Sequence, residues 1–252
     1  MVNVLISGAL GRMGKKVFES GLNCEEVKLV CGIDIKDDFS NPNFPIYDCF
    51  CKVNEKIDVI IDFSRPTSLD NILDFAIKNN CGVVFCTTGY TEEDLAKIDD
   101  ASKKIAVFRS ANMSLGVNVL IKAVKEVASK LGDFDIEITE AHHNKKVDAP
   151  SGTALMLADA VKNVLTDKNY VYGRSGVVGK RTKQEIGIHA IRGGNIVGDH
   201  QVMFIGENET ITLSHHASDR ALFADGAIKA SIFLKGKNSG FYDMNDLLSE
   251  ND

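Results

Sequence analysis

The first fourteen residues restrict the fold more than any other part of the chain. A short apolar run with strand character, Val2–Ser7, leads directly into the glycine-rich sequence Gly8-Ala9-Leu10-Gly11-Arg12-Met13-Gly14, and a helical pattern follows. The G-x-x-G-x-x-G spacing is a variant of the dinucleotide-binding fingerprint. Its glycines permit a tight turn, close approach of a pyrophosphate to the backbone and close packing of the helix. The order of strand, glycine turn and helix predicts a dinucleotide site.

A second apolar run supports this interpretation. Val27–Ile33 has strand character and ends at Asp34. A carboxylate about 20 residues beyond the glycine motif is where a partner for a ribose hydroxyl is expected. The alternative, an incidental glycine turn in an α/β domain, does not account for Asp34.

Apolar runs and amphipathic helical patterns alternate from residue 1 to about residue 112. The strands expected after the first two are Ile57–Phe63, Gly82–Thr87 and Ile105–Arg109, and helices are expected over Ser68–Lys78 and Thr91–Lys103. This alternation predicts an α/β, Rossmann-like, doubly wound parallel sheet. Short polar residues follow three of the strands. They are typical of a cofactor groove, and the alternative is that they form plain connecting turns.

The second half of the chain changes pattern. Helical spacing over Leu115–Leu131 precedes an alternating strand, Phe134–Glu140, and a helix, Ala154–Leu165. Strand-like pieces then occur at Ile186–Ile191, Gln201–Ile205 and Thr210–Ser214, and a helical pattern returns over Leu222–Lys235. We therefore expect a dinucleotide-binding domain of residues 1–112 completed by 223–252. Residues 113–222 are expected to form an α+β domain with an open, mostly antiparallel sheet, a meander of its last strands.

The densest group of chemically active side chains lies between Glu140 and Ala154. It contains His142, His143 and two lysines, and it ends in a Pro-Ser-Gly-Thr start to a helix. Histidine exchanges protons near neutral pH, lysine supplies positive charge, and a helix start presents N–H groups to an anion. These residues predict a site that binds and protonates an acidic small molecule. The alternative is a polar loop before an ordinary capped helix.

Composition excludes several classes of protein. The net charge of −6 disfavours a general nucleic-acid binder. No apolar run approaches the ~20 residues that span a bilayer, and the chain starts on a strand, so we expect a cytoplasmic protein without a signal peptide.

The six cysteines form no C-x-x-C pair, so reduced thiols are expected and a zinc site is not. The basic, glycine-rich segment 172–181 is either a loop over the site or, as we favour, a solvated surface loop.

Two of these motifs together resemble one family. The glycine motif, the Glu140-Ala141-His142-His143 sequence and the run Lys146-Val147-Asp148-Ala149-Pro150-Ser151-Gly152-Thr153-Ala154 closely resemble dihydrodipicolinate reductase (4-hydroxy-tetrahydrodipicolinate reductase). The likeness covers essentially the whole chain and includes the Arg192-Gly193-Gly194 turn and Val197-Gly198-Asp199-His200. The histidine pair followed by the Lys-Val-Asp-Ala-Pro-Ser-Gly-Thr sequence is highly specific to that family.

The resemblance implies a role for each matching residue. His142 would be the proton donor and Lys146 the second catalytic donor, while His143, Gly152 and Thr153 would bind a substrate carboxylate. The cofactor NADH or NADPH would contact Gly8, Ala9, Leu10, Gly11, Arg12, Met13, Asp34, Cys86, Thr87, Thr88, Ser110, Ala111, Asn112 and Met113. The implied reaction transfers a hydride to a cyclic dicarboxylate in the diaminopimelate route of lysine biosynthesis, in a homotetramer and without a metal.

Two positions depart from the family pattern. Cys86 replaces a glycine common before Thr-Thr, and Ile35 stands where some relatives have an arginine, with Lys36 one residue later. The second departure puts recognition of a 2′-phosphate in doubt, so we expect use of both cofactors with a preference for NADH. The rival hypotheses are another two-domain reductase of a small carbonyl or imine acid, and a non-catalytic nicotinamide-binding protein.

Overall fold

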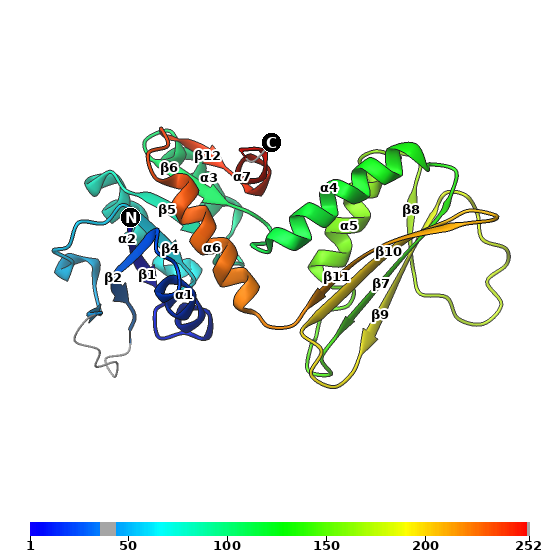
Figure 1. Ribbon diagram of the computed structural model, residues 1–252, viewed down its shortest axis with the longest axis horizontal. Coiled ribbons are helices and arrows are strands. Elements are labelled where there is room, and N and C mark those ends of the chain that lie inside the picture. The colour runs from blue at the N-terminus through cyan, green and yellow to red at the C-terminus, as the bar shows by residue number, and fades with distance from the viewer. Residues whose placement is uncertain (36–43, 251–252) are drawn as a thin grey trace. The chain divides into compact units, whose positions relative to one another are not determined.

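The computed structural model describes residues 1–35 and 44–250. Contacts between Cα atoms divide the chain into two units (Figure 1). The first contains Met1–Ser114 and Arg220–Asp252, and the second contains Leu115–Asp219. The chain therefore leaves the first unit once and returns to it at helix α6 (Ala221–Leu234).

A seven-stranded sheet forms the first unit, in the order β12-β6-β5-β4-β1-β2-β3, and every pairing in it is parallel. Its strands are β1 (Val2–Ser7), β2 (Val27–Ile33), β3 (Ile46–Tyr47), β4 (Val59–Asp62), β5 (Gly82–Phe85), β6 (Ala106–Arg109) and β12 (Gly240–Tyr242). All four residues of β4 are buried, as expected of a parallel strand with both faces covered. The expected doubly wound, Rossmann-like sheet is confirmed.

Helices cover both faces of this sheet. Strand residues such as Leu5, Ile60 and Val83 share a core with α2 (Leu69–Asn79) and α3 (Glu92–Ser102). Helix α6 packs against β4, β5 and α1 (Arg12–Leu22). Figure 1 shows α1 and α6 side by side in front of the strands. In this unit the predicted strands and helices lie within two residues of their expected bounds. By contrast, β3, β12 and α7 (Met244–Ser249) were not predicted, because such short segments have no measurable periodicity.

The second unit contains a five-stranded sheet in the order β11-β10-β7-β9-β8. The strands are β7 (Asp135–His142), β8 (Asn169–Tyr172), β9 (Glu185–Arg192), β10 (Gly198–Ile205) and β11 (Thr210–Ala217). Helices α4 (Leu115–Lys130) and α5 (Gly152–Lys162) cover one face, where Ile138, Val202 and Leu157 lie in one core.

The strand pairing corrects one expectation about this sheet. β10 pairs antiparallel with both β11 and β7, but β9 pairs parallel with β7 and β8, so the sheet is mixed rather than mostly antiparallel. The expected meander is wrong because β7 lies between β9 and β10. The chain crosses over through α5 before β8, and a crossover of this kind returns a strand parallel to the first.

Glu137 attaches the glycine-rich segment after β8 to the open face of this sheet. Its carboxylate accepts two hydrogen bonds from Arg174, both of 2.9 Å, one of 3.0 Å from Arg181 Nε, and one shared with His189 Nε2 at 2.7 Å. A Cβ at Gly187, the register partner of Glu137, would overlap this carboxylate. The segment is therefore tied down at two arginines rather than fully solvated.

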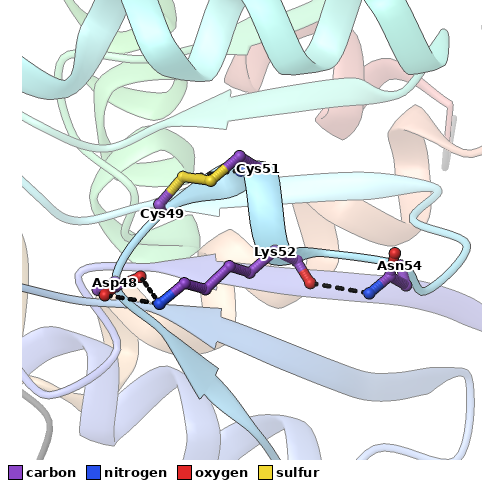
Figure 2. Close-up of a disulfide and its surroundings, with 5 residues drawn as sticks. All are labelled: Asp48, Cys49, Cys51, Lys52 and Asn54. Atoms are coloured by element: carbon purple, nitrogen blue, oxygen red, sulfur yellow. Dashed lines mark hydrogen bonds and ion pairs between the residues drawn. A yellow bond between two sulfur atoms is a disulfide. The ribbon is translucent and has the colours of Figure 1, made fainter.

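Cys49 and Cys51 form a disulfide, which corrects the expectation that all cysteines are reduced. The bond joins Cys49, the N-cap of the short helix η1 (Phe50–Lys52), to Cys51 within that helix, and their Cα atoms lie 5.3 Å apart. Figure 2 shows the pair beside the Lys52–Asp48 ion pair of 2.8 Å. Residues separated by two positions meet only where the backbone turns this tightly, and no sequence signal indicated the turn. The cysteines at positions 24, 31, 81 and 86 are free.

Candidate active site

The glycine-rich turn of the first unit leaves no room for side chains at two positions. Gly8 has a φ of +77°, and a Cβ there would lie 2.7 Å from the carbonyl oxygen of Phe63. A Cβ at Gly14 would lie 2.7 Å from the carbonyl oxygen of Ala9. Gly11 is the N-cap of α1, and no side chain caps this helix start. The turn therefore brings bare backbone to the N-terminus of a helix, an arrangement that favours a phosphate group.

Asp34 lies next to this turn, as expected. Its Oδ2 accepts a hydrogen bond of 2.8 Å from the Leu10 N–H, and its own N–H donates to the Tyr47 carbonyl oxygen at 3.0 Å. A cavity of about 700 Å³ opens here, and Gly8, Leu10, Gly11 and Asp34 line it. This volume suits a nucleotide.

The structure adds wall residues that the sequence did not assign to the cofactor. The disulfide forms part of the cavity wall, and so does Arg65, which follows β4. Arg65 lies in the polar segment that follows the strand expected at Ile57–Phe63, so its position in the sequence could have indicated a role in the cofactor site. Ala9, by contrast, is buried, and Arg12 is exposed at the start of α1. Met13 is half-buried there.

The other expected cofactor residues follow the neighbouring strands β5 and β6. Because β4, β5 and β6 are adjacent and parallel, their carboxyl ends share one edge of the sheet. The buried Thr87 hydroxyl lies at this edge, close to the Tyr90 side chain. Burial raises the pKa of the Cys86 thiol well above its ordinary value, so this side chain is uncharged at neutral pH. Thr88 is exposed.

The segment after β6 holds the last group of expected cofactor residues. Asn112 Oδ1 accepts a 2.9 Å hydrogen bond from the Ser114 N–H, which fixes the turn. Met113 is buried, and the absence of a side chain at Gly226 on α6 lets its carbonyl oxygen approach that helix. Ser110 is half-buried and Ala111 is exposed. The structure thus places Met113 in the core and Ala111 at the surface.

In the second unit, the end of β7 presents His142 next to a buried carboxylate. His142 Nδ1 lies 2.7 Å from Glu140 Oε2, and the Glu140 side chain has no exposed surface. Arg192, at the end of β9, donates one hydrogen bond of 2.8 Å to each Glu140 oxygen. Burial opposes ionisation, but hydrogen bonds from Arg192, His142 and the Ser151 N–H outweigh it and lower the pKa of Glu140. Glu140 is therefore a buried carboxylate at neutral pH.

Helix α5 begins beside this carboxylate. The Ser151 N–H donates to Glu140 Oε1 at 3.0 Å, and Ser151 Oγ caps the helix by accepting from the Ala154 N–H at 3.2 Å. Gly152 is exposed with open space around its Cα, and Thr153 is half-buried. At the start of α5, the exposed Gly152 is therefore the residue that an anion can reach, on the helix end next to Glu140.

Lys146 belongs to the same hydrogen-bonded network. Its ammonium group lies 2.9 Å from Asp148 Oδ1. The backbone N–H of Lys146 donates a hydrogen bond of 3.1 Å to the His143 carbonyl oxygen. Arg192 also donates a hydrogen bond of 2.7 Å to the Asp148 carbonyl oxygen. Arg192 thus connects the segment that carries Lys146 and His143 to Glu140 and His142. Glu140 and Arg192 both lie in the motifs that resemble the family, but the sequence alone indicated no role for either residue.

His200 on β10 completes the surroundings of His142. The two rings meet edge to face with centroids 5.2 Å apart, and His200 Nε2 shares a 3.0 Å hydrogen bond with Ser151 Oγ. Burial, followed by the neighbouring His142, lowers the pKa of His200 to about 4, so it is neutral at pH 7. A Cβ at Gly198 would lie 3.0 Å from His142 Nε2. His200 therefore packs against the ring without adding charge, and the missing side chain at Gly198 leaves room for it.

In residues 1–35 and 44–250, no group of three or more His, Cys, Asp or Glu residues is arranged to hold a metal ion. Among the same residues, no helix has the length and apolar character needed to cross a membrane.

Comparison with known proteins gives consistent matches over the whole chain. The model for the N-terminus of dihydrodipicolinate reductase matches residues 2–113, and that for its C-terminus matches residues 116–248. A 4-hydroxy-tetrahydrodipicolinate reductase of Clostridium tetani is 48% identical over 251 residues, which cover 99% of this chain and 98% of the relative. One from Methanocaldococcus jannaschii is 40% identical, covering 100% and 99%.

Solved structures agree in fold. A dipicolinate-bound dihydrodipicolinate reductase from Paenisporosarcina sp. TG-14 superposes with a TM-score of 0.82 at 26% identity, covering 97% of this chain and 99% of that one. An aspartate dehydrogenase from Thermotoga maritima superposes with a TM-score of 0.51 at 16% identity, covering 94% and 98%, and shares the fold alone.

Proposed function

The chain belongs to the dihydrodipicolinate reductase family, and on this premise we propose that it reduces 4-hydroxy-tetrahydrodipicolinate to tetrahydrodipicolinate. The reductant is NADH or NADPH, and the reaction belongs to the diaminopimelate route of lysine biosynthesis. One observation supports this most strongly: a histidine bonded to a buried carboxylate lies beside the N-terminus of α5, where Gly152 is exposed. That arrangement provides a proton and an anion-binding site together.

The first unit binds the cofactor in this proposal. The bare turn from Gly8 to Gly14 receives the pyrophosphate, and Asp34 accepts hydrogen bonds from the adenosine ribose. The residues after β5 and β6, including the buried Thr87 hydroxyl, contact the nicotinamide half. The bound cofactor supplies the hydride, and these residues orient it.

The second unit binds the substrate. One carboxylate of the cyclic dicarboxylate accepts hydrogen bonds from the backbone of Gly152 and Thr153, and His143 and Lys146 supply further donors. Hydride addition at carbon leaves negative charge on the conjugated nitrogen. His142 quenches this charge by donating a proton, with Lys146 as second donor, a contribution typically worth ~10²–10⁴ in rate.

A coupled assay tests this proposal. The cyclic dicarboxylate is generated in situ, and the loss of NADH or NADPH absorbance is followed with the wild-type protein and with His142→Ala. Turnover that requires both the dicarboxylate and His142 supports it. Equal turnover with a monocarboxylic semialdehyde would favour the rival reductase. Tight cofactor binding without turnover would favour a binding protein.

Cofactor preference follows from the charge of Asp34. A carboxylate there binds both ribose hydroxyls and repels a 2′-phosphate, so we propose use of both cofactors with a preference for NADH. Arg12 and Arg65 oppose this preference, while Lys36 lies outside the described residues. The test compares kcat/KM for the two cofactors at one ionic strength. A tenfold preference for NADPH, equal to ~1.4 kcal/mol, would contradict the role given to Asp34.

The second unit also provides a surface for assembly, and we propose a homotetramer formed through it. β8 and β11 are the edges of its sheet, and Ile191 on the open face is 55% exposed. Exposed strand edges and apolar side chains favour association. Light scattering at micromolar concentration measures the mass, and a monomer would refute the proposal. Reduced nicotinamide cofactors are cytoplasmic metabolites, so the proposal locates the enzyme in the cytoplasm.

A further inference from the structure

Glu140 is bonded to three separate parts of the second unit. Its side chain has no exposed surface, yet it carries charge and contacts His142 on its own strand, Arg192 at the end of β9 and Ser151 at the start of α5. A buried carboxylate is expensive unless every oxygen is paired, and here both oxygens are. Such an arrangement is unnecessary for a sheet core, where an apolar side chain would serve.

We propose that Glu140 is a positioning residue that orients the proton donor and the carboxylate-binding helix end together. The proposal rests on the proposed function, in which His142 is that donor. Oε2 fixes the imidazole, while Oε1 fixes the Ser151 N–H. A single side chain thus sets the separation between the donated proton and the carboxylate site.

The hydrogen bond from His142 to Glu140 determines which nitrogen can act as the acid. A carboxylate accepts, so Nδ1 carries the proton in this contact and Nε2 is left to face the substrate. During the reaction the Nε2–H bond breaks, an N–H bond forms on the substrate, and the imidazolium becomes neutral with its Nδ1–H still bonded to Glu140. Gly198 leaves space beside Nε2, since a Cβ there would come within 3.0 Å.

Arg192 keeps the Glu140 carboxylate ionised and connects it to the segment that carries Lys146. Its two terminal nitrogens pair with both Glu140 oxygens at 2.8 Å, and one of them also binds the Asp148 carbonyl oxygen at 2.7 Å. Asp148 in turn pairs with Lys146. The position of the second donor therefore also depends on Glu140, through Arg192.

The charged and titratable groups around the His142 ring are few. They are Glu140 on β7, Arg192 on β9 and His200 on β10, with His143 adjacent in sequence. His200 is neutral near pH 7. Glu140 is the group among these that makes a hydrogen bond with the His142 ring.

The same strand provides a matched control. Glu137 also lies 2.7 Å from a histidine nitrogen, that of His189, and is also paired with an arginine through two hydrogen bonds. It belongs to the open face of the sheet, on the opposite side of β7 from Glu140, because the two residues are an odd number of positions apart. Glu137→Gln therefore makes the same chemical change away from the site.

The experiment compares Glu140→Gln, Glu137→Gln and the wild type by the pH profile of kcat/KM and by NADH titration. Glu140→Gln is expected to lower kcat roughly 10²-fold, because a misoriented imidazole loses its acid function. It should move the alkaline limb of kcat/KM to lower pH, since a neighbouring negative charge has been removed. NADH affinity should stay unchanged. Glu137→Gln should leave the pH profile in place.

A wild-type pH profile in Glu140→Gln, or an equal displacement in Glu137→Gln, would overturn the proposal. If Glu140→Gln does not fold, Glu140→Asp replaces it in the experiment. Glu140→Asp should lower kcat but leave the alkaline limb of kcat/KM in place, because the carboxylate charge remains. The ¹⁵N chemical shifts of the His142 ring provide a readout independent of turnover. Retention of the Nδ1–H tautomer in Glu140→Gln refutes the positioning role. Absence of turnover in the wild type refutes the proposed function instead.

Discussion

Glu137 and its partners Arg174, Arg181 and His189 make the unfolding free energy of the second unit fall at acid pH. Burial opposes ionisation of Glu137, but hydrogen bonds from Arg174, His189 and Arg181 outweigh it and lower its pKa from the ordinary 4.5 to about 2. The Glu137 side chain is 12% exposed, so solvent screens these interactions little. A carboxylate with a lowered pKa in the folded state stabilises that state above pH 4.5. This stabilisation is lost as the pH falls through about 2.

The magnitude follows from the same numbers. A difference between 4.5 and about 2, at about 1.4 kcal/mol per pH unit, corresponds to about 3 kcal/mol of unfolding free energy. Substitution Glu137→Gln removes the titrating group. The difference in unfolding free energy between wild type and variant should therefore shrink by about 3 kcal/mol between pH 7 and pH 2.

Urea denaturation followed by circular dichroism at pH 7, 5, 3 and 2 measures this difference. Subtracting the variant from the wild type cancels the other carboxylates. Glu126→Gln on α4 is the control, because Glu126 is 74% exposed and lies 3.9 Å from Lys130. An exposed pair of this kind contributes little. The reasoning is refuted if the wild type and Glu137→Gln lose stability in parallel on acidification, or if Glu126→Gln behaves like Glu137→Gln.

Three further predictions concern the site and the cysteines. His142→Ala and Lys146→Ala should each lower kcat by ~10²-fold or more while circular dichroism stays unchanged, and near-normal kcat in either would exclude its catalytic role. Gly14→Ala should destabilise the first unit by roughly 4 kcal/mol or more, because its Cβ overlaps the backbone of Gly8 and Ala9; a wild-type Tm in thermal unfolding would contradict the turn geometry. Alkylation of the unfolded protein without reductant, followed by mass spectrometry, should label the four cysteines at positions 24, 31, 81 and 86 and leave Cys49 and Cys51 unlabelled until a thiol reductant is added. Six labelled cysteines before reduction would show that the pair is not bonded.

Local sequence alone determined the elements of the nucleotide-binding part. The run Val2–Ser7 is a strand and a glycine turn with a helix follows it, because consecutive residues decide these features. Asp34 lies at the turn because the two strands that lead to Gly8 and Asp34 are parallel neighbours. His142 is the last residue of β7, two positions beyond the expected end of the alternating strand, and α5 begins at the Ser-Gly-Thr sequence.

Only the tertiary structure decided which distant residues meet. Arg192 and Glu140 are 52 positions apart, and they touch because β9 pairs in register with β7. The alternating pattern of a strand shows which face is buried but not which strand lies beside it, so the sequence suggested a meander and missed the insertion of β7. Cys49 and Cys51 likewise meet through a turn that has no sequence signature. Strand order and register depend on the packing of the whole sheet against α4 and α5, and for that physical reason the partners of Glu140 became visible only in the fold.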